Sequence, residues 1–269
     1  MAKKERLDVL VVTKGLCETR EKAQKIIMAG KVLVNEQKID KVGTKVAADS
    51  TIRILGEINP YASRGGFKLA EAFKAFPISM KDQVVVDLGA STGGFVDCAL
   101  QNGAKRVYAI DVGYGQLAWK LRTDERVINM EKTNARFLTP EDFPELMDWM
   151  TTDVAFISLT KIFPAAYTLL KDEGSGIALI KPQFEAGRER VGKNGVVRDP
   201  ETHVDVITHI LAFSEELGFK TQGVVHSPIQ GPEGNIEYLY WFTKNPAATS
   251  VAIDVQALVD RTFADFGKS

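Results

Sequence analysis

Residues 84–95 read Val-Val-Val-Asp-Leu-Gly-Ala-Ser-Thr-Gly-Gly-Phe, and this stretch decides the fold. The apolar run before the glycines is typical of a parallel strand that is buried on both faces. The glycines let the backbone approach a bound molecule closely, and the helix expected after them presents unpaired N–H groups. The stretch therefore predicts a strand, a ligand-binding loop and a helix in an open α/β sheet.

Strands and helices alternate after this unit. Further strands are expected at residues 106–110 and 127–130, before residue 153, at 177–180, and as a last pair at 221–226 and 236–242. A loop rich in proline and glycine joins the last pair, which is typical of an antiparallel hairpin. The pattern predicts a Rossmann-like α/β sheet, mostly parallel with an antiparallel last strand.

Length and composition fit one large and one small domain. The chain has 269 residues, of which 45% are hydrophobic, enough for one sizeable core and an extra module. Cys17 and Cys98 are too few for a disulfide framework, and no apolar signal segment follows Met1. No stretch approaches the roughly 20 apolar residues of a membrane helix. We therefore expect a cytoplasmic protein that does not insert into membranes.

The charge is unevenly distributed along the chain. Residues 1–68 hold 14 Lys and Arg against 8 Asp and Glu, a net charge of +6, and the remainder holds 20 against 27, a net charge of −7. The positive end is the end expected to meet a polyanion. The alternative is an ordinary solvated surface, because charge excesses of this size also occur on domains that bind no nucleic acid.

Residues 6–56 are expected to form a small module of two helices and two strands. Thr19 is the predicted N-cap of the second helix and Gly30 its end, the strands are expected at residues 31–35 and 51–55, and Asn35 in a tight turn. Five basic side chains are expected on one surface, where they would hold phosphates: Arg6, Lys14, Arg20, Lys22 and Lys25. The alternative is a packing module with solvated charges.

The run from residue 6 to residue 35 resembles the RNA-binding domain named after the small-subunit ribosomal protein S-four. Arg-Leu-Asp at residues 6–8, Thr-Arg-Glu-Lys-Ala at 19–23 and Gly-Lys-Val-Leu-Val-Asn at 30–35 carry the resemblance. Thr19 stands where serine is commoner, and both residues cap helices. The resemblance implies that residues 1–58 recognise structured RNA.

Residues 59–64 are the predicted linker between that domain and residues 65–269. Pro60 interrupts regular structure, and Arg64 with the glycines after it forms a cationic approach to a helix expected from Phe67 to Phe76. Lys68 would lie in the first turn of this helix, where the helix dipole does not favour a lysine. Taken alone, Lys68 is interpreted as a surface residue.

Two acidic residues flank the glycine loop. The loop lacks the Gly-x-Gly-x-x-Gly fingerprint, and Asp87 suits an ammonium or sulfonium group better than a pyrophosphate. Asp111 ends the next strand, where it can accept hydrogen bonds from ribose hydroxyls or cap a following helix. The pair favours S-adenosylmethionine over NAD. The predicted cofactor-binding residues are Asp87, Gly89, Ala90, Ser91, Thr92, Gly93, Asp111, Asn134 and Asp153, whereas the neighbouring Phe137 is expected in the core.

Four charged residues are expected at one edge of the sheet, where strands end. Asp153 and Lys181 follow the fourth and fifth strands, the last hairpin brings Glu237 there, and Lys68 opens its helix. A ribose 2′-hydroxyl is a poor nucleophile, so its methylation needs an oriented base. We expect Lys181 to be that base, Asp153 to orient its amine, and Lys68 with Glu237 to form a second pair that positions the hydroxyl. A structural ion pair is the alternative.

These four residues resemble the Lys-Asp-Lys-Glu tetrad of FtsJ-like ribose 2′-O-methyltransferases. With the S-four-type segment, the Asp-Leu-Gly-Ala-Ser-Thr-Gly-Gly-Phe loop and Asp-Val-Gly-Tyr-Gly-Gln-Leu at 111–117, nearly the whole chain is similar to the TlyA family. That resemblance implies 2′-O-methylation of cytidine in ribosomal RNA, with ribosomal RNA or subunits as partners. Members are often also called haemolysins. Residues 59–62 differ from the Arg-x-Trp-Val linker of some members.

Three remaining features complete the expectations. Arg188 and Arg190 lie in a glycine-rich loop that is either solvated or closes over RNA. Arg64, in the linker, is also expected to contact RNA. The apolar spacing of residues 251–266 predicts a helix that packs on the sheet, and the three histidines, His203, His209 and His226, lack the spacing of metal ligands. An enzyme, a non-catalytic RNA-binding assembly factor and a haemolysin all stay open.

Overall fold

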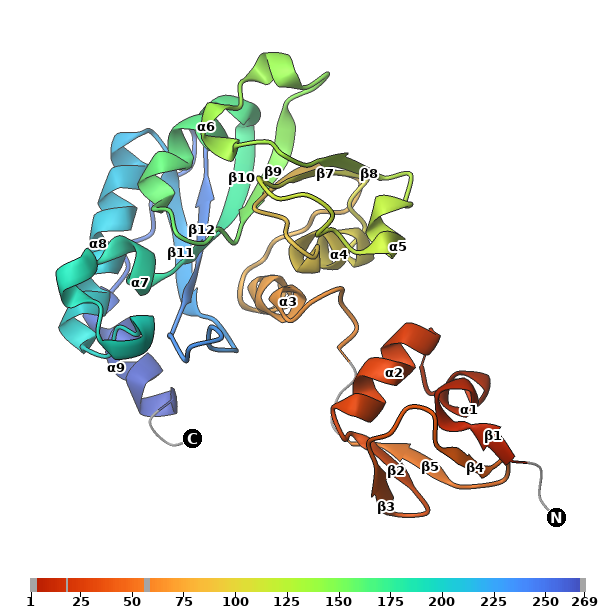
Figure 1. Ribbon diagram of the computed structural model, residues 1–269. Helices are drawn as coiled ribbons and strands as arrows, with labels where there is room; N and C mark the ends of the chain where they lie inside the picture. Colours follow the sequence, from red (N-terminus) through yellow and green to blue (C-terminus); the bar gives the residue numbers. More distant parts are fainter. Residues whose placement is uncertain (1–3, 18, 56–58, 267–269) are drawn as a thin grey trace. The chain divides into compact units, whose positions relative to one another are not determined.

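The computed structural model describes residues 4–17, 19–55 and 59–266 (Figure 1). The chain divides into two compact units, Met1–Pro60 and Tyr61–Ser269. The predicted domain boundary at residue 58 lies outside the described residues, as does Glu18 of the S-four-type segment. Tyr61, in the predicted linker, packs its ring against Phe67 in the larger unit, at 5.6 Å between ring centroids.

The small unit packs two helices on short strands. Helices α1 (Leu7–Thr13) and α2 (Arg20–Met28) bury Leu7, Val11 and Ile27, and the Thr19 side chain caps α2 by accepting from the Lys22 N–H. The strands form a three-stranded sheet in the order β3-β2-β5 and a β1-β4 pair. Their bounds are β1 (Lys4–Arg6), β2 (Val32–Val34), β3 (Gln37–Ile39), β4 (Lys45–Ala47) and β5 (Ile52–Ile54).

The prediction of two strands in this unit is incomplete, because β3 and β4 lie between β2 and β5 in the sequence. Asn35 and Glu36 both have positive φ, 49° and 63°, and form the two-residue turn of the β2–β3 hairpin. The tight turn at Asn35 is therefore confirmed. β3 was missed because its residues Gln37 and Lys38 are exposed, so the three-residue strand has no apolar pattern.

The large unit is built on a seven-stranded sheet in the order β11-β12-β10-β9-β6-β7-β8. β12 is antiparallel to both β10 and β11, and the β10–β9–β6–β7–β8 pairs are parallel. The predicted fold is confirmed. The strands are β6 (Val84–Leu88), β7 (Arg106–Ile110), β8 (Val127–Met130), β9 (Met147–Thr152), β10 (Leu170–Ile180), β11 (Lys220–His226) and β12 (Tyr238–Thr243).

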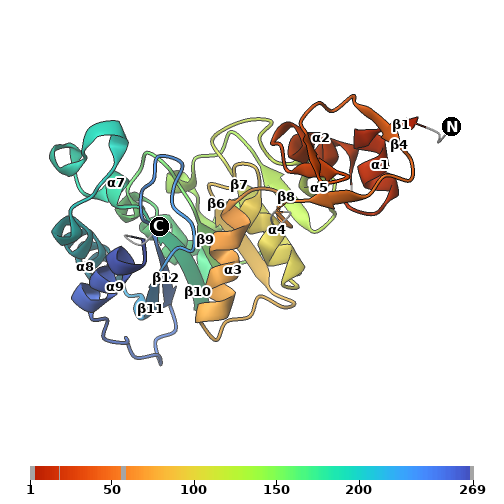
Figure 2. The ribbon, with the colours of Figure 1, turned by 90° about the horizontal axis from the view of Figure 1, so that it is seen from below.

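Helices cover both faces of this sheet (Figure 2). Val85 points into a cluster with helices α3 and α4, whereas Val84 and Val86 point into a second cluster with α6, α8 and α9. α9 packs through buried Leu258 and Val259, as predicted for the tail. The helices are α3 (Gly65–Ala75), α4 (Gly94–Gln101), α5 (Trp119–Arg122), α6 (Phe163–Leu169), α7 (Pro182–Glu185), α8 (Pro200–Glu216) and α9 (Val255–Phe266).

Candidate active site

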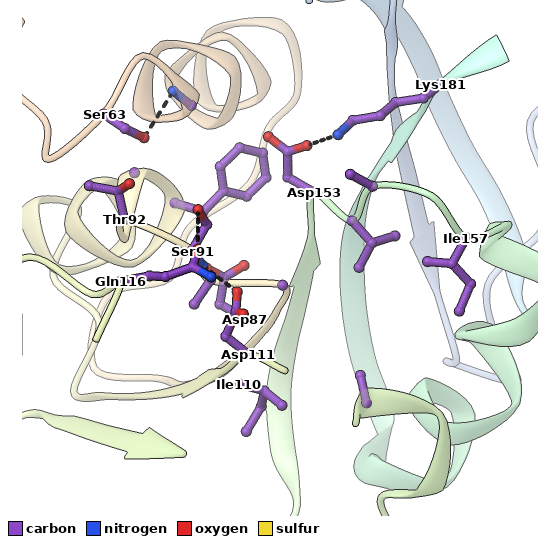
Figure 3. A pocket seen from close by; sticks show the side chains of 18 of the residues that line it. Ser63, Asp87, Ser91, Thr92, Ile110, Asp111, Gln116, Asp153, Ile157 and Lys181 are labelled. Atoms are coloured by element: carbon purple, nitrogen blue, oxygen red, sulfur yellow. Dashed lines mark hydrogen bonds and ion pairs between the residues drawn. The ribbon is translucent and has the colours of Figure 1, made fainter. Parts of the chain in front are cut away.

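A cavity of about 740 Å³ opens at the carboxyl ends of β6, β7, β9 and β10 (Figure 3). This is the edge at which open α/β sheets bind ligands. It gathers all four predicted catalytic residues and eight of the nine predicted cofactor residues, which are Asp87, Gly89, Ala90, Ser91, Thr92, Asp111, Asn134 and Asp153. Gly93 does not line it. Its φ of 93° instead turns the loop into α4.

The glycine loop runs close beneath the end of β9. Gly89 has φ +90°, and a Cβ there would lie 2.9 Å from Val154 Cγ1. A side chain at this position would therefore be both strained and crowded. The Gly89 and Ala90 N–H groups both donate to Ile110 O at 2.9 Å, which ties the loop to the end of β7.

Asp87 carries a buried carboxylate with an unused oxygen. Its Oδ1 accepts from Thr151 Oγ1 at 2.7 Å, whereas its Oδ2 is buried without a hydrogen-bond partner. Burial, with a smaller contribution from the charges of Asp153 and Asp111, raises the pKa of Asp87 to about 7. A cationic group in the cavity would satisfy this oxygen, so the site fits the ammonium of S-adenosylmethionine.

Asp111 orders the loops on both sides of the cavity. Its Oδ2 accepts from the Ser91 N–H and its Oδ1 from the Gly113 N–H, both at 2.7 Å. The alternative role as a helix cap is wrong: the next helix, α5, follows Ala118. Figure 3 shows Asp111 beside Asp87, with Gln116 reaching Ser91 Oγ at 3.3 Å.

The first turns of α3 and α4 meet on one side of the cavity. A Cβ on Gly94 would lie 2.8 Å from the Gly66 N atom, so only glycine permits this approach. Ser63, Gly65, Thr92 and Gly94 line the cavity here. Two helix N-termini favour a negative group nearby, which fits the carboxylate of a cofactor with an amino-acid end. Sequence reasoning missed Ser63 because one serine before a helix carries no distinct signal.

The four catalytic candidates form a continuous row of ion pairs. Lys181 Nζ lies 2.5 Å from Asp153 Oδ1, and Lys68 Nζ lies 3.2 Å from Asp153 Oδ2. Lys68 Nζ also lies 2.7 Å from Glu237 Oε2. Both pairs expected from the sequence are present, and Asp153 is in addition shared by the two lysines, because α3 places Lys68 between the two carboxylates.

Burial and charge act in opposite directions within this row. Burial alone would raise the pKa of Asp153, but the Lys181 and Lys68 ammonium groups outweigh it and lower this pKa. Burial would lower the pKa of Lys68, but Asp153 and Glu237 raise it. For Glu237 burial dominates, and its pKa is raised despite Lys68 and Lys181. Asp153 is thus the fixed anion of the row.

An aromatic side chain stands at the cavity mouth. Phe156 is 91% exposed, has a positive φ of 63°, and packs on Phe184 at 5.1 Å between ring centroids. A bulky residue with positive φ is uncommon and indicates a constrained position. Phe137, expected in the core, is instead 70% exposed. Both were beyond sequence reasoning, because an aromatic residue after a strand is more often buried.

Two of the three predicted RNA-binding arginines of the large unit, Arg64 and Arg190, contact other residues of that unit. Arg64 donates from Nη2 to Gln230 O at 3.1 Å, so it bridges to the loop before β12. Arg190 pairs with Asp205 of α8 at 2.8 Å, whereas Arg188 is exposed. The loop that carries Arg188 and Arg190 is exposed at residues 187–190 and contacts α8 through the Arg190–Asp205 pair.

The predicted RNA-binding residues of the small unit lie on its two helices and β1. Arg6 and Arg20 both contact Asp8, and Lys25 pairs with Glu21 at 3.1 Å. Lys14 and Lys25 are exposed, and Lys22 is half-buried. Their role in RNA binding stays a prediction.

The described residues contain neither a cluster of metal ligands nor a helix that could cross a membrane. Across residues 4–17, 19–55 and 59–266, no three His, Cys, Asp or Glu side chains gather as metal ligands do. In the same part of the chain, no helix is both long and apolar enough to cross a membrane. Both ring nitrogens of the buried His203 are engaged in hydrogen bonds, one with the Tyr238 hydroxyl and one with the Val197 carbonyl.

Known proteins resemble both units. The FtsJ-like methyltransferase family model matches residues 61–244, and the S4 domain model matches residues 5–52. The chain is 56% identical over 239 residues to the rRNA methyltransferase candidate YqxC of Bacillus subtilis, which covers 88% of this chain and 85% of that protein. It is 39% identical over 261 residues to the 16S/23S rRNA (cytidine-2′-O)-methyltransferase TlyA of Mycobacterium tuberculosis, covering 97% and 96% of the two chains.

A solved structure agrees with these relatives. A hemolysin candidate from Streptococcus thermophilus has a TM-score of 0.78 and 45% identity to this chain, covering 100% of this chain and 98% of that one. The FtsJ-like match alone spans more than half of the chain, and the relatives extend over both units in the same order. The chain therefore belongs to the TlyA family, in which an S4 domain precedes an FtsJ-like methyltransferase domain.

Proposed function

We propose that this chain transfers a methyl group from S-adenosylmethionine to the 2′-hydroxyl of a ribose, that of a cytidine, in ribosomal RNA. The observation that carries the proposal is the buried row Lys181–Asp153–Lys68–Glu237 beside the cavity of the glycine loop. The name of the Mycobacterium tuberculosis relative supports the cytidine and the ribosomal RNA. We further propose that residues 1–58 form the RNA-binding domain, 59–64 the linker and 65–269 the methyltransferase domain.

The cofactor residues follow from the chemistry of the cavity. S-adenosylmethionine supplies a methyl group that is bonded to a sulfonium. When the methyl group is transferred, the sulfur becomes neutral and S-adenosylhomocysteine is the leaving group. Asp87 would hold its ammonium, Asp111 its ribose hydroxyls, and the first turns of α3 and α4 its carboxylate. Asn134 lines the cavity beyond Asp111 and would flank the adenine.

The catalytic residues orient a hydroxyl and take its proton. Lys181 must first release one proton of its ammonium to solvent, and its neutral amine would then accept the hydroxyl proton as the hydroxyl oxygen bonds to the methyl carbon and the bond from that carbon to sulfur breaks. Asp153 fixes the direction of that amine, and Lys68 with Glu237 positions the hydroxyl. Much of the rate would come from alignment, because an in-line displacement requires the oxygen, carbon and sulfur to lie on one line.

The RNA contacts would come from both units. In the large unit these would be Arg64, which lines the cavity, together with Arg188 and Arg190. The small unit would add Arg6, Lys14, Arg20, Lys22 and Lys25. A substrate of ribosomal RNA or subunits would place the enzyme in the cytoplasm. The non-catalytic assembly factor and the haemolysin have no comparable support, because neither requires a buried four-residue row of charges.

Transfer of label from S-adenosylmethionine tests the proposed function. Separated ribosomal subunits and naked ribosomal RNA are incubated with the full chain. The label should appear in RNA. After alkaline hydrolysis it should remain in one resistant dinucleotide, and it should map to a cytidine. Label that stays on a base, or cofactor binding without transfer to any of these RNAs, would contradict the proposed reaction.

Replacing Asp111 by asparagine should weaken cofactor binding by roughly tenfold to a hundredfold, since hydrogen bonds to charged groups contribute about 1.5–3 kcal/mol. The carboxylate would lose its bonds to the cofactor and loosen the Ser91 and Gly113 loops. Calorimetric titration with S-adenosylmethionine measures the change. Asp260→Asn, at an exposed position of α9, is the control, and equal affinities of the two variants would contradict the assignment.

A further inference from the structure

Asp8 is a fully buried carboxylate in the small unit that contacts three side chains. It accepts from Arg6 Nε at 3.0 Å and Arg6 Nη2 at 3.1 Å, and from Arg20 Nε at 2.7 Å. Gln24 Nε2 donates to it at 3.0 Å. One carboxylate in α1 therefore fixes two guanidinium groups, one from β1 and one from α2.

The arginines differ from Asp8 in exposure. The side chains of Arg6 and Arg20 are 43% and 54% exposed, whereas that of Asp8 is inaccessible. The hydrogen bond from Arg6, followed by those from Gln24 and Arg20, holds the pKa of Asp8 below its ordinary value despite burial. The carboxylate stays ionised at all physiological pH values, and it offsets the repulsion between two neighbouring guanidinium groups.

We propose that Asp8 is a positioning residue, which fixes Arg6 and Arg20 as a rigid pair that binds RNA phosphate. The inference rests on the proposed RNA substrate. Guanidinium groups bind phosphate through a planar fork of donors. A fork that is already immobilised in the free protein loses less conformational freedom on binding. Because both groups share one carboxylate, they lie close enough to act on the same stretch of backbone.

The inference makes a prediction opposite to that of simple charge counting. Asp8→Asn removes a negative charge from the most basic part of the chain, so electrostatics alone would tighten RNA binding. Positioning predicts weaker binding, because the amide no longer fixes two cations. We expect affinity for naked ribosomal RNA to fall about tenfold, and the dependence of log affinity on log salt to become shallower by about one.

The experiment measures binding of the full chain to naked 16S and 23S ribosomal RNA at several salt concentrations. Wild type is compared with Asp8→Asn, with Arg20→Lys, and with the control Glu21→Gln. Glu21 is an exposed acid on the adjacent helix, paired with Lys25, and its loss should leave binding unchanged or tighter. Arg20→Lys keeps the charge but not the fork, so it should weaken binding as Asp8→Asn does.

Two further measurements distinguish a folding defect from a loss of RNA binding. Thermal unfolding and cofactor affinity of each variant show whether both units remain folded at the temperature of the binding assay. If Asp8→Asn does not fold, Arg20→Lys carries the test alone. Asp8→Asn or Arg20→Lys binding as tightly as wild type overturns the inference, whereas failure of wild type to bind either RNA contradicts the proposed function instead.

Discussion

Lys181→Ala should lower the turnover number for methyl transfer by roughly 10²–10⁴-fold, the usual contribution of a general base. Affinity for S-adenosylmethionine should change little, because Lys181 contacts Asp153 and not Asp87 or Asp111, which would hold the cofactor ammonium and ribose. Single-turnover transfer to ribosomal RNA, with cofactor affinity measured in parallel, gives both quantities. The effect is large because the proton of the hydroxyl then has no oriented acceptor.

The same two strands provide a matched control. Lys171 is the second residue of β10 and pairs with Asp148 of β9 at 2.6 Å, whereas Lys181 directly follows β10 and pairs with Asp153, which directly follows β9. Lys171→Ala removes an equivalent ion pair at the opposite edge of the sheet and should leave turnover near that of wild type. Equal losses in the two variants would show that Lys181 supports the sheet and does not act on the hydroxyl.

Asp87→Asn should stabilise the cofactor-free protein and weaken cofactor binding at the same time. The pKa of Asp87 is about 7 in the folded protein, against an ordinary value of 3.8. A group with a raised folded pKa favours the folded state when protonated, and this contribution is lost as pH rises through 7. At pH 8.5 the buried carboxylate should cost on the order of 4 kcal/mol, which the neutral amide avoids.

Thermal unfolding with and without S-adenosylmethionine, at pH 6 and pH 8.5, measures this effect. Without cofactor, the variant should unfold at a higher temperature than wild type at pH 8.5, and the difference should shrink at pH 6. With cofactor the order should reverse at pH 8.5, because ligand binding stabilises only a protein that binds it. A variant that is less stable than wild type without cofactor at pH 8.5 would show that Asp87 is a structural acceptor for Thr151 instead.

The sequence predicted the residues of the cavity correctly where a charged residue lies at the carboxyl end of a strand. Asp87 lies in the last two residues of a parallel strand, Asp111, Asp153 and Lys181 directly follow such strands, and parallel strands end at one edge. The sharing of Asp153 between two lysines was not predictable, because it depends on where α3 packs. Ser63 and Phe156 were missed for a similar reason: their place at the cavity follows from tertiary contacts, and single serine or phenylalanine residues have no spacing pattern.

The position of β12 sets the order in which the site can be completed during synthesis. β11 is made before β12, yet among the described strands it pairs with β12 alone, and β12 separates it from β10. Glu237, the last partner of Lys68, directly precedes β12. A nascent chain can therefore form the glycine loop with Asp87, the proposed cofactor site, before Glu237 joins the proposed catalytic row. Methylation competence should begin only when the carboxyl-terminal strands have left the ribosome.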